Sequence, residues 1–526
     1  MARKLFVQAL SRRGQRPAAP VGRRMRKGTD RKMSQSKEQR AQKKALEEKK
    51  RRQTRVAVIV TAVVIAVFVA ALLTINSKAF RRSATAVTVG DTKFSVVDFN
   101  YFFYMEYYDY LSRVYSEYPG YADSMLPDTS QPLDAQYVSA DETWADRIGN
   151  AALDTILDTA AAWQAGHAAG YELSQDKLDE IDETYAAAEA QASMNGYSLD
   201  AFLSRNYGKG ISGKTWKNLL LMKAYADEYR EKVKNDFSYS QDELDRYYAE
   251  HATDLDVYCL RSFYISDSAY ENGMEGAKAA ADSYKESIRT EQDLIDAARD
   301  FDADTYEDDA STLHYYAGNA LAGPYRDWVK DEGRQTGDVY VAENESHGGY
   351  YVLYYVERIR NEYPCASVYM ISMFADEIIA DNYDTTEAYE SALAVARSDL
   401  KDEAEEVLAE WNKAKEKTAD TFKVLYDDHT ENYYYENGLY ESYHRHEYTD
   451  DMDAWVYDEA RKQGDAAIFS ESDGDSYYFL MFDSMGGRYR DYLARDGLSS
   501  SDYLSWDASI KEGLSAQKTV WFSQTG

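Results

Sequence analysis

The sequence predicts an α+β protein behind a single transmembrane helix, and three observations support this fold class. An uncharged run of 20 residues near the amino terminus is long enough to cross a bilayer. Helical periodicity dominates the following residues, up to about position 256. Beyond that position, strand patterns alternate with helical patterns, and one motif occurs twice.

The predicted transmembrane helix covers residues 56–75, which read VAVIVTAVVIAVFVAALLTI. At about 1.5 Å per residue, a helix of this length spans about 30 Å, the thickness of a bilayer's hydrocarbon core. Residues 1–55 carry 20 Lys and Arg against 4 Asp and Glu, whereas the residues after 75 carry 40 against 88. Because basic flanks remain in the cytosol, we expect a single-pass protein of the cell membrane, with a cytosolic amino terminus and an extracytoplasmic bulk.

A cleaved signal peptide is the alternative interpretation of this run. Signal peptides combine a short basic region with about 7–15 apolar residues. Both segments are longer here, so we expect an uncleaved anchor. The basic cytosolic tail, residues 1–55, should lack a fixed fold and be attracted to anionic lipid headgroups. The acidic excess after residue 75 argues against a nucleic-acid partner for the extracytoplasmic part.

Residues 84–256 are predicted to form a helical module. A small hairpin over residues 86–95, with Gly90 and Asp91 at its turn, opens it. Helices are expected at residues 96–117 and 144–163, the second with apolar residues at three- and four-residue spacing.

An internal repeat follows this module. The segment DWVKDEGRQTGDVYV at 327–341 aligns without a gap with AWVYDEARKQGDAAI at 454–468. We interpret the shared residues as structural: the Trp anchors a helix to a sheet, Arg and Asp fix the next turn, and Gly supplies a tight backbone. These residues are Trp328, Arg334, Gly337 and Asp338 in the first copy, and Trp455, Arg461, Gly464 and Asp465 in the second.

Each copy belongs to a predicted α+β unit, at residues 257–362 and 363–489. Their opening strands align LRSFYIS at 260–266 with ASVYMIS at 366–372. The second unit is longer between this strand and the repeated motif. We assign the extra residues to a long helix over residues 387–417.

The order of these parts resembles the SurA- and PrsA-type extracytoplasmic chaperones. The hairpin, the helix after it, and the patterns at 158–173 and 198–209 are similar to the SurA amino-terminal module. The two α+β units resemble parvulin domains, the peptidyl-prolyl isomerase fold of those proteins. The resemblance implies a membrane-anchored chaperone or foldase that binds unfolded or partly folded exported polypeptides. It also implies that the C-terminal helical segment, residues 490–526, returns to the amino-terminal module.

The parvulin resemblance lacks its catalytic histidines. Active parvulins place one His on the opening strand and one on the closing strand. The corresponding positions are Phe263, or its neighbour Ser262, and Tyr351 in the first unit, and Tyr369 and Tyr478 in the second. We therefore assign no catalytic residue and expect weak or no isomerase activity. Two alternative functions remain open: an active parvulin-type prolyl isomerase, and a surface scaffold or assembly protein with one folded partner.

Three further sequence features suggest a ligand, a metal or a disulfide. Residues 208–215, GKGISGKT, match the P-loop pattern, but the preceding residues read as a helix where a P-loop needs a strand, so we expect no nucleotide. His444 and His446 lack a third metal ligand, and we expect no metal or other cofactor. Cys259 and Cys365 form either one disulfide or two half-buried thiols.

Tyrosine, with 48 residues, is the strongest compositional signal. Exposed tyrosines supply rigid, amphipathic contact area for peptide binding, although they are also ordinary surface residues.

The predicted topology has a direct test. Protease added to intact cells should digest the residues after 75 and spare residues 1–55, because only the acidic part is expected outside. Immunoblots with antibodies against each end measure this. Protection of the acidic part with loss of the basic tail would contradict the orientation.

Overall fold

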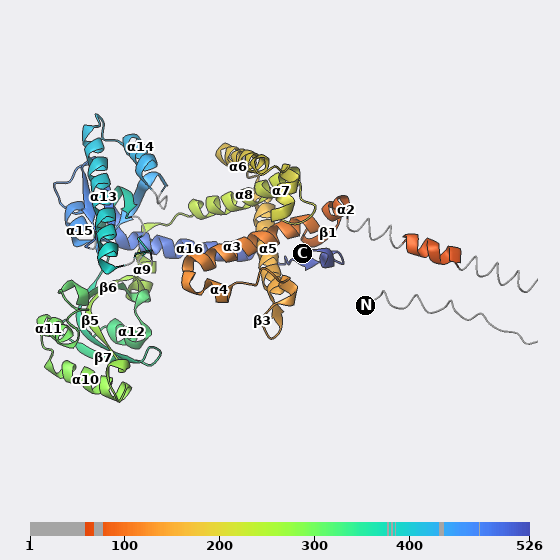
Figure 1. The fold of residues 1–526 in the computed structure, drawn as a ribbon. Helices are drawn as coiled ribbons and strands as arrows, with labels where there is room; N and C mark the ends of the chain where they lie inside the picture. Colours follow the sequence, from red (N-terminus) through yellow and green to blue (C-terminus); the bar gives the residue numbers. More distant parts are fainter. Residues whose placement is uncertain are drawn as a thin grey trace, which may run out of the picture. The chain divides into compact units, whose positions relative to one another are not determined.

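The computed structural model describes residues 58–67 and 77–525, apart from residues 376, 377, 380, 381, 384, 431–435 and 473 (Figure 1). Residues 58–67 are helical. The basic tail and the rest of the predicted span at 56–75 lie outside the described residues. Within the described part of the chain, no helix is long and apolar enough to cross a membrane.

The fold class is α+β, with helices and small antiparallel sheets. The chain divides into two compact units that do not follow chain order. The first unit combines Met1–Ala161, Leu173–Ala224 and Leu514–Gly526. The second combines Ala162–Glu172 with Tyr225–Gly513. The last residues of the chain therefore belong with the first.

The first unit contains the predicted hairpin, which gains a third strand. Strands β1 (Thr85–Val89) and β2 (Thr92–Ser95) pair antiparallel. Strand β13 (Gln517–Lys518) adds to the other edge of β1, with Val87 opposite Lys518. The expected return of the C-terminal segment is therefore made by a strand, and the sheet order is β13-β1-β2.

Helix α3 (Val96–Glu117) begins where the hairpin ends, because Ser95 and Asp98 form a capping box. Its first two turns are buried, with Phe99 and Phe102 in a core shared with Ile148 and Ile156 of the next long helix. The other helices and strands of this part of the chain are α2 (Lys78–Ser83), α4 (Ala122–Met125), β3 (Tyr137–Ser139), β4 (Glu142–Thr143), α5 (Trp144–Ala169), α6 (Gln175–Met194), α7 (Leu199–Asn206) and α8 (Gly213–Asp236).

The second unit contains two sheets of identical topology. We call the parts that carry them the first repeat and the second repeat. The first repeat consists of β5 (Val257–Ser266), α10 (Met274–Ser287), α11 (Glu291–Phe301), β6 (Leu313–Ala317), α12 (Gly323–Lys330), β7 (Val339–Asn344) and β8 (Gly349–Ile359). The second repeat consists of β9 (Pro364–Phe374), α13 (Thr386–Lys413), α14 (Ala419–His429), β10 (Leu439–Tyr443), α15 (Asp450–Val456), β11 (Ala466–Ser470) and β12 (Ser476–Arg488).

Both sheets are antiparallel and place the opening and closing strands at the centre. The strand orders are β6-β5-β8-β7 and β10-β9-β12-β11. Helices cover both faces of each sheet: α10 and α11 pack on one face of the first sheet and α12 on the other. Because α13 has 28 residues and α10 has 14, most of the extra residues of the second repeat lie in α13, within the predicted long helix.

Outside the repeats, the second unit contains the ends of α5 and α8 and two whole helices. Helices α9 (Gln241–Leu255) and α16 (Tyr489–Lys511) pack together around Leu244, Tyr248 and Ala494. The helix of the predicted C-terminal segment is thus part of the second unit, whereas the strand after it belongs to the first.

Gly318, a buried residue between β6 and α12, gives a test of this packing. A Cβ atom there would lie 2.0 Å from the carbonyl oxygen of Thr253, which is backbone. Gly318→Ala should therefore lower the free energy of unfolding of the second unit by about 1–3 kcal/mol. The matched control is Gly323→Ala, since a Cβ at Gly323 meets no atom within 4 Å. Urea unfolding of both variants measures the difference, and equal stability would contradict the packing described.

Candidate functional site

The tyrosine expected on the closing strand of the first repeat lies opposite a second tyrosine. Tyr351 pairs with Tyr264 across β8 and β5, and their rings lie 4.8 Å apart. The ring of Tyr325 from α12 lies 5.2 Å from that of Tyr351. The rings of Tyr264, Tyr325 and Tyr351 therefore lie together on one face of the sheet.

Phe263 lies on the opposite face of this sheet. It packs beneath α10 and α11, whereas Tyr351 packs towards α12. Side chains of adjacent strand residues point to opposite faces, so Phe263 and Tyr351 cannot flank one bound peptide bond. Of the two predicted opening-strand positions, Phe263 is separated from Tyr351 by the sheet, whereas Ser262 lies on the face of Tyr351, whose direct partner is Tyr264.

The second repeat shows the same separation. Tyr369 packs against Phe422 of α14, and Tyr478 lies on the other face, where its hydroxyl donates to Glu471. Tyr478 pairs with Ser372.

The strand ladders also correct the alignment of the two opening strands. Since Tyr351 and Tyr478 correspond, their partners Tyr264 and Ser372 correspond as well. The counterpart of Phe263 is then Ile371, two residues beyond the predicted Tyr369. Short apolar strands align poorly by sequence because their residue types are interchangeable, whereas hydrogen-bonded pairing fixes one register.

The repeated motif makes the same contacts in both repeats. The Arg334 Nε–H donates to the carbonyl oxygen of Trp328 at 3.1 Å, and its guanidinium lies 4.2 Å from the Trp328 ring centroid. The corresponding values for Arg461 and Trp455 are 3.0 Å and 4.0 Å.

The acidic residue of each motif completes the turn. Asp338 accepts from Arg334 at 3.0 Å, and Asp465 lies 3.7 Å from Arg461. Gly337 and Gly464 have φ angles of 96° and 85°, which glycine adopts without strain. These contacts fix the end of a helix against a sheet.

Cys259 and Cys365 are two separate buried thiols, each on an opening strand. Burial raises the pKa of Cys259 to about 11 and that of Cys365 to about 12. Of the two alternatives from the sequence, the structure has the free thiols. Because thiolate is the reactive form, neither side chain is suited to nucleophilic chemistry.

The residues of the P-loop pattern and of the histidine pair lie among helices and aromatic side chains. Helix α7 precedes residues 208–215, in place of the strand that a P-loop requires. The ring of His444 stacks on Tyr489, and that of His446 stacks on Tyr315. Across the described residues, no cluster of three or more His, Cys, Asp or Glu side chains is arranged to hold a metal ion.

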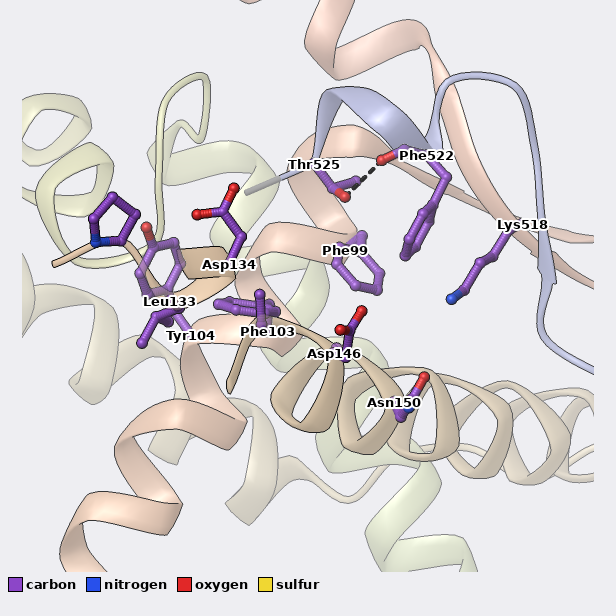
Figure 2. Close-up of a pocket in the computed structure, with 13 residues that line it drawn as sticks. Phe99, Phe103, Tyr104, Leu133, Asp134, Asp146, Asn150, Lys518, Phe522 and Thr525 are labelled. Carbon is purple, nitrogen blue, oxygen red and sulfur yellow. Dashed lines mark hydrogen bonds between the residues drawn. The ribbon is translucent and has the colours of Figure 1, made fainter. Parts of the chain in front are cut away.

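A cavity of about 480 Å³ lies in the first unit, away from all the residues singled out by sequence. We call it the aromatic pocket. Figure 2 shows Phe99, Phe103 and Phe522 grouped together, with polar side chains around them. The pocket is lined by Phe99, Phe103, Tyr104, Pro132, Leu133, Asp134, Ala145, Asp146, Gly149, Asn150, Lys518, Phe522 and Thr525.

Four parts of the chain build this pocket. Buried Phe99 and Phe103 come from α3, and Gly149 comes from the buried side of α5. The loop at 132–134 supplies the third wall. Phe522, from the turn after β13, places its ring 4.8 Å from that of Phe99. The volume is within the range of about 300–1,000 Å³ that is usual for ligand pockets.

Charged side chains lie at the rim of the aromatic pocket. Asp146 accepts from the backbone N–H of Thr143 at 3.1 Å and from its hydroxyl at 2.6 Å. These hydrogen bonds lower the pKa of Asp146, so it is ionised at neutral pH. Asp134 and Lys518 are exposed on other elements of the rim.

Tyrosines continue from the pocket along α3. The ring of Tyr104, which lines the pocket, lies 6.3 Å from that of Tyr108. Tyr108, Tyr115 and Tyr118 are 39%, 58% and 46% exposed. The pocket and these tyrosines together offer aromatic surface to an extended ligand.

Sequence reasoning missed the aromatic pocket. Its residues carry no motif, and Phe99 and Phe522 are far apart in the chain. The sequence does contain an aromatic cluster at residues 99–110, but nothing in that pattern locates a cavity.

Two tyrosines of the repeats differ in whether their hydroxyl groups make a hydrogen bond. The Tyr264 hydroxyl is buried without a hydrogen-bond partner in the described residues, so Tyr264→Phe should leave stability unchanged or raise it. Tyr443 donates to the buried carboxylate of Asp453 at 2.9 Å, and Tyr443→Phe should cost about 1–3 kcal/mol. Urea unfolding of the two variants tests this, and a larger loss for Tyr264→Phe would contradict it.

Comparisons with known proteins add little to this description. No family model matches the chain, and no curated protein matches it. Among solved structures, PrsA from Bacillus subtilis matches with 13% identity over 42% of this chain and 76% of that chain, at a TM-score of 0.14. A TM-score this low carries no argument, so the function has to be inferred from the residues themselves.

Proposed function

We propose that this protein is a membrane-anchored extracytoplasmic chaperone or foldase that binds unfolded or partly folded exported polypeptides in the aromatic pocket. The observation that supports it best is the pocket itself: a cavity of about 480 Å³ with a phenylalanine floor, beside exposed tyrosines. Unfolded chains expose bulky apolar side chains, and such a cavity removes them from water. Burying one large side chain contributes about 1.5–3 kcal/mol.

The rest of the chain has a supporting role in this proposal. Residues 56–75 anchor the protein in the cell membrane, and residues 84–256 form a chaperone module of the SurA type. Residues 257–362 and 363–489 are parvulin-like units, and residues 490–526 link the second unit to the first. The large acidic excess keeps the extracytoplasmic part soluble while apolar side chains are bound.

Prolyl isomerase activity is not part of the proposal. Tyr264 and Tyr351 lie together on the first sheet, and Ser372 and Tyr478 on the second. None of these side chains is an imidazole. The barrier to rotation of a peptide bond is about 18–20 kcal/mol, and the buried, unpartnered hydroxyl of Tyr264 is not placed to interact with a substrate amide.

Filling the pocket tests the proposed function. A Cβ at Gly149 would contact only the Phe103 ring, at 3.9 Å, so Gly149→Leu should fold and project its side chain into the cavity. Both leucine and alanine favour a helix over glycine, by about 1 kcal/mol. The variant should lose most of the ability of the full-length chain to prevent aggregation, whereas Gly149→Ala should retain it.

The measurement uses full-length protein in lipid nanodiscs and follows light scattering of a chemically denatured model protein without ATP. Suppression by the wild type and by Gly149→Ala, but not by Gly149→Leu, supports the proposal. A wild-type chain that leaves aggregation unchanged overturns it. A large acceleration of prolyl isomerisation in a peptide assay would instead favour an active isomerase.

A further inference from the structure

We propose that the aromatic pocket selects polypeptide segments in which a bulky apolar residue lies next to a lysine or arginine. This inference rests on the proposed function and names the class of segment that the pocket takes. It comes from the charges at the rim, which are independent of the size of the cavity.

The floor of the pocket accepts the apolar side chain. Phe99 and Phe103 are buried in the core of the first unit and present fixed ring surfaces. The Phe522 ring packs edge-on against Phe99, with an angle of 72° between the rings. A floor held by the core on one side and by the C-terminal turn on the other has a defined shape before a ligand arrives, which reduces the entropic cost of binding.

Two carboxylates at the rim supply the charge preference. Asp134 and Asp146 come from different elements and both line the cavity. In the part of the chain that the structure describes, neither carboxylate has an ion-pair partner within 4.0 Å, although Lys518 is close enough to Asp146 to interact with its charge. The capping hydrogen bonds of Asp146 use one oxygen, Oδ2, and hold the carboxylate in place. An ionised, immobile carboxylate beside an apolar floor favours a ligand with a cation close to its apolar group.

Lys518 is the cation of the rim, and it opposes this preference. Its Nζ atom lies 4.6 Å from the centroid of the Phe522 ring, in a cation–π contact. The rim therefore has two negative charges against one positive charge. Removing Lys518 should strengthen the binding of a cationic segment, whereas removing Asp134 should weaken it. These opposite changes would not arise if the side chains mattered only for folding.

The experiment measures the affinity of fluorescent peptides for the full-length chain in phosphatidylcholine nanodiscs, with empty nanodiscs as the blank. Three peptides share one phenylalanine and differ only in its two neighbours, which are Lys, Gln or Glu. We expect the affinities to fall in that order, with about two- to fivefold between steps, as is typical of solvent-exposed charge pairs. High salt should compress the differences.

The variants assign the preference to the rim. Asp134→Asn should lower the affinity for the Lys peptide by about two- to fivefold and leave the affinity for the Gln peptide unchanged. Lys518→Gln should raise the affinity for the Lys peptide by a similar factor. Asp146→Asn should act like Asp134→Asn, but it also changes the helix cap. The control is Glu189→Gln, which removes an exposed carboxylate from α6, outside the pocket, and should change nothing.

The outcomes separate this inference from the proposed function. If all three peptides bind equally well and Asp134→Asn and Lys518→Gln have no effect, the charge preference is wrong while polypeptide binding stands. If Glu189→Gln lowers the affinity for the Lys peptide as much as Asp134→Asn does, the preference arises from the overall charge of the protein, and the inference is also wrong. If none of the peptides binds, the proposed function itself fails.

Discussion

Backbone pairing between β1 and β13 is the contact on which the first unit and its pocket depend. Strand β13 adds only two residues to the sheet, yet the backbone N–H of Thr519 donates to the carbonyl oxygen of Ala86 at 2.9 Å and extends the pairing. The rings of Trp521 and Phe522 then pack on Phe80 and Phe99. Because Lys518, Phe522 and Thr525 line the pocket, it exists only when the C-terminal residues are in place.

This arrangement has a consequence for folding. Contacts between residues far apart in sequence form late, because closing a long loop costs entropy before the contact contributes. The first unit is completed by residues that follow the whole of the second unit. We infer that the aromatic pocket forms only after the repeats have been synthesised and β13 has paired with β1.

The two repeats show how one local contact can be kept while a sheet face changes. The arginine of each motif donates to the carbonyl oxygen of its tryptophan and lies over the tryptophan ring, with distances that agree closely between the copies. The faces beside these motifs differ, since Tyr264 in the first repeat corresponds to Ser372 in the second. The contact is local in sequence and therefore visible as a motif, whereas the faces are formed by pairing between distant strands.

The sequence alone determined the features that depend on neighbouring residues. Helix periodicity, the hairpin turn, the extra length of α13 and the tryptophan motif all follow from side chains a few positions apart. Tertiary structure decided the rest. The observed strand pairing shows that Ile371, and not Tyr369, corresponds to Phe263, and that Tyr264 is the partner of Tyr351. These pairs could not be predicted because register is set by pairing across the sheet. The pocket could not be predicted because its walls come from segments more than three hundred residues apart, and no local pattern encodes which of them meet.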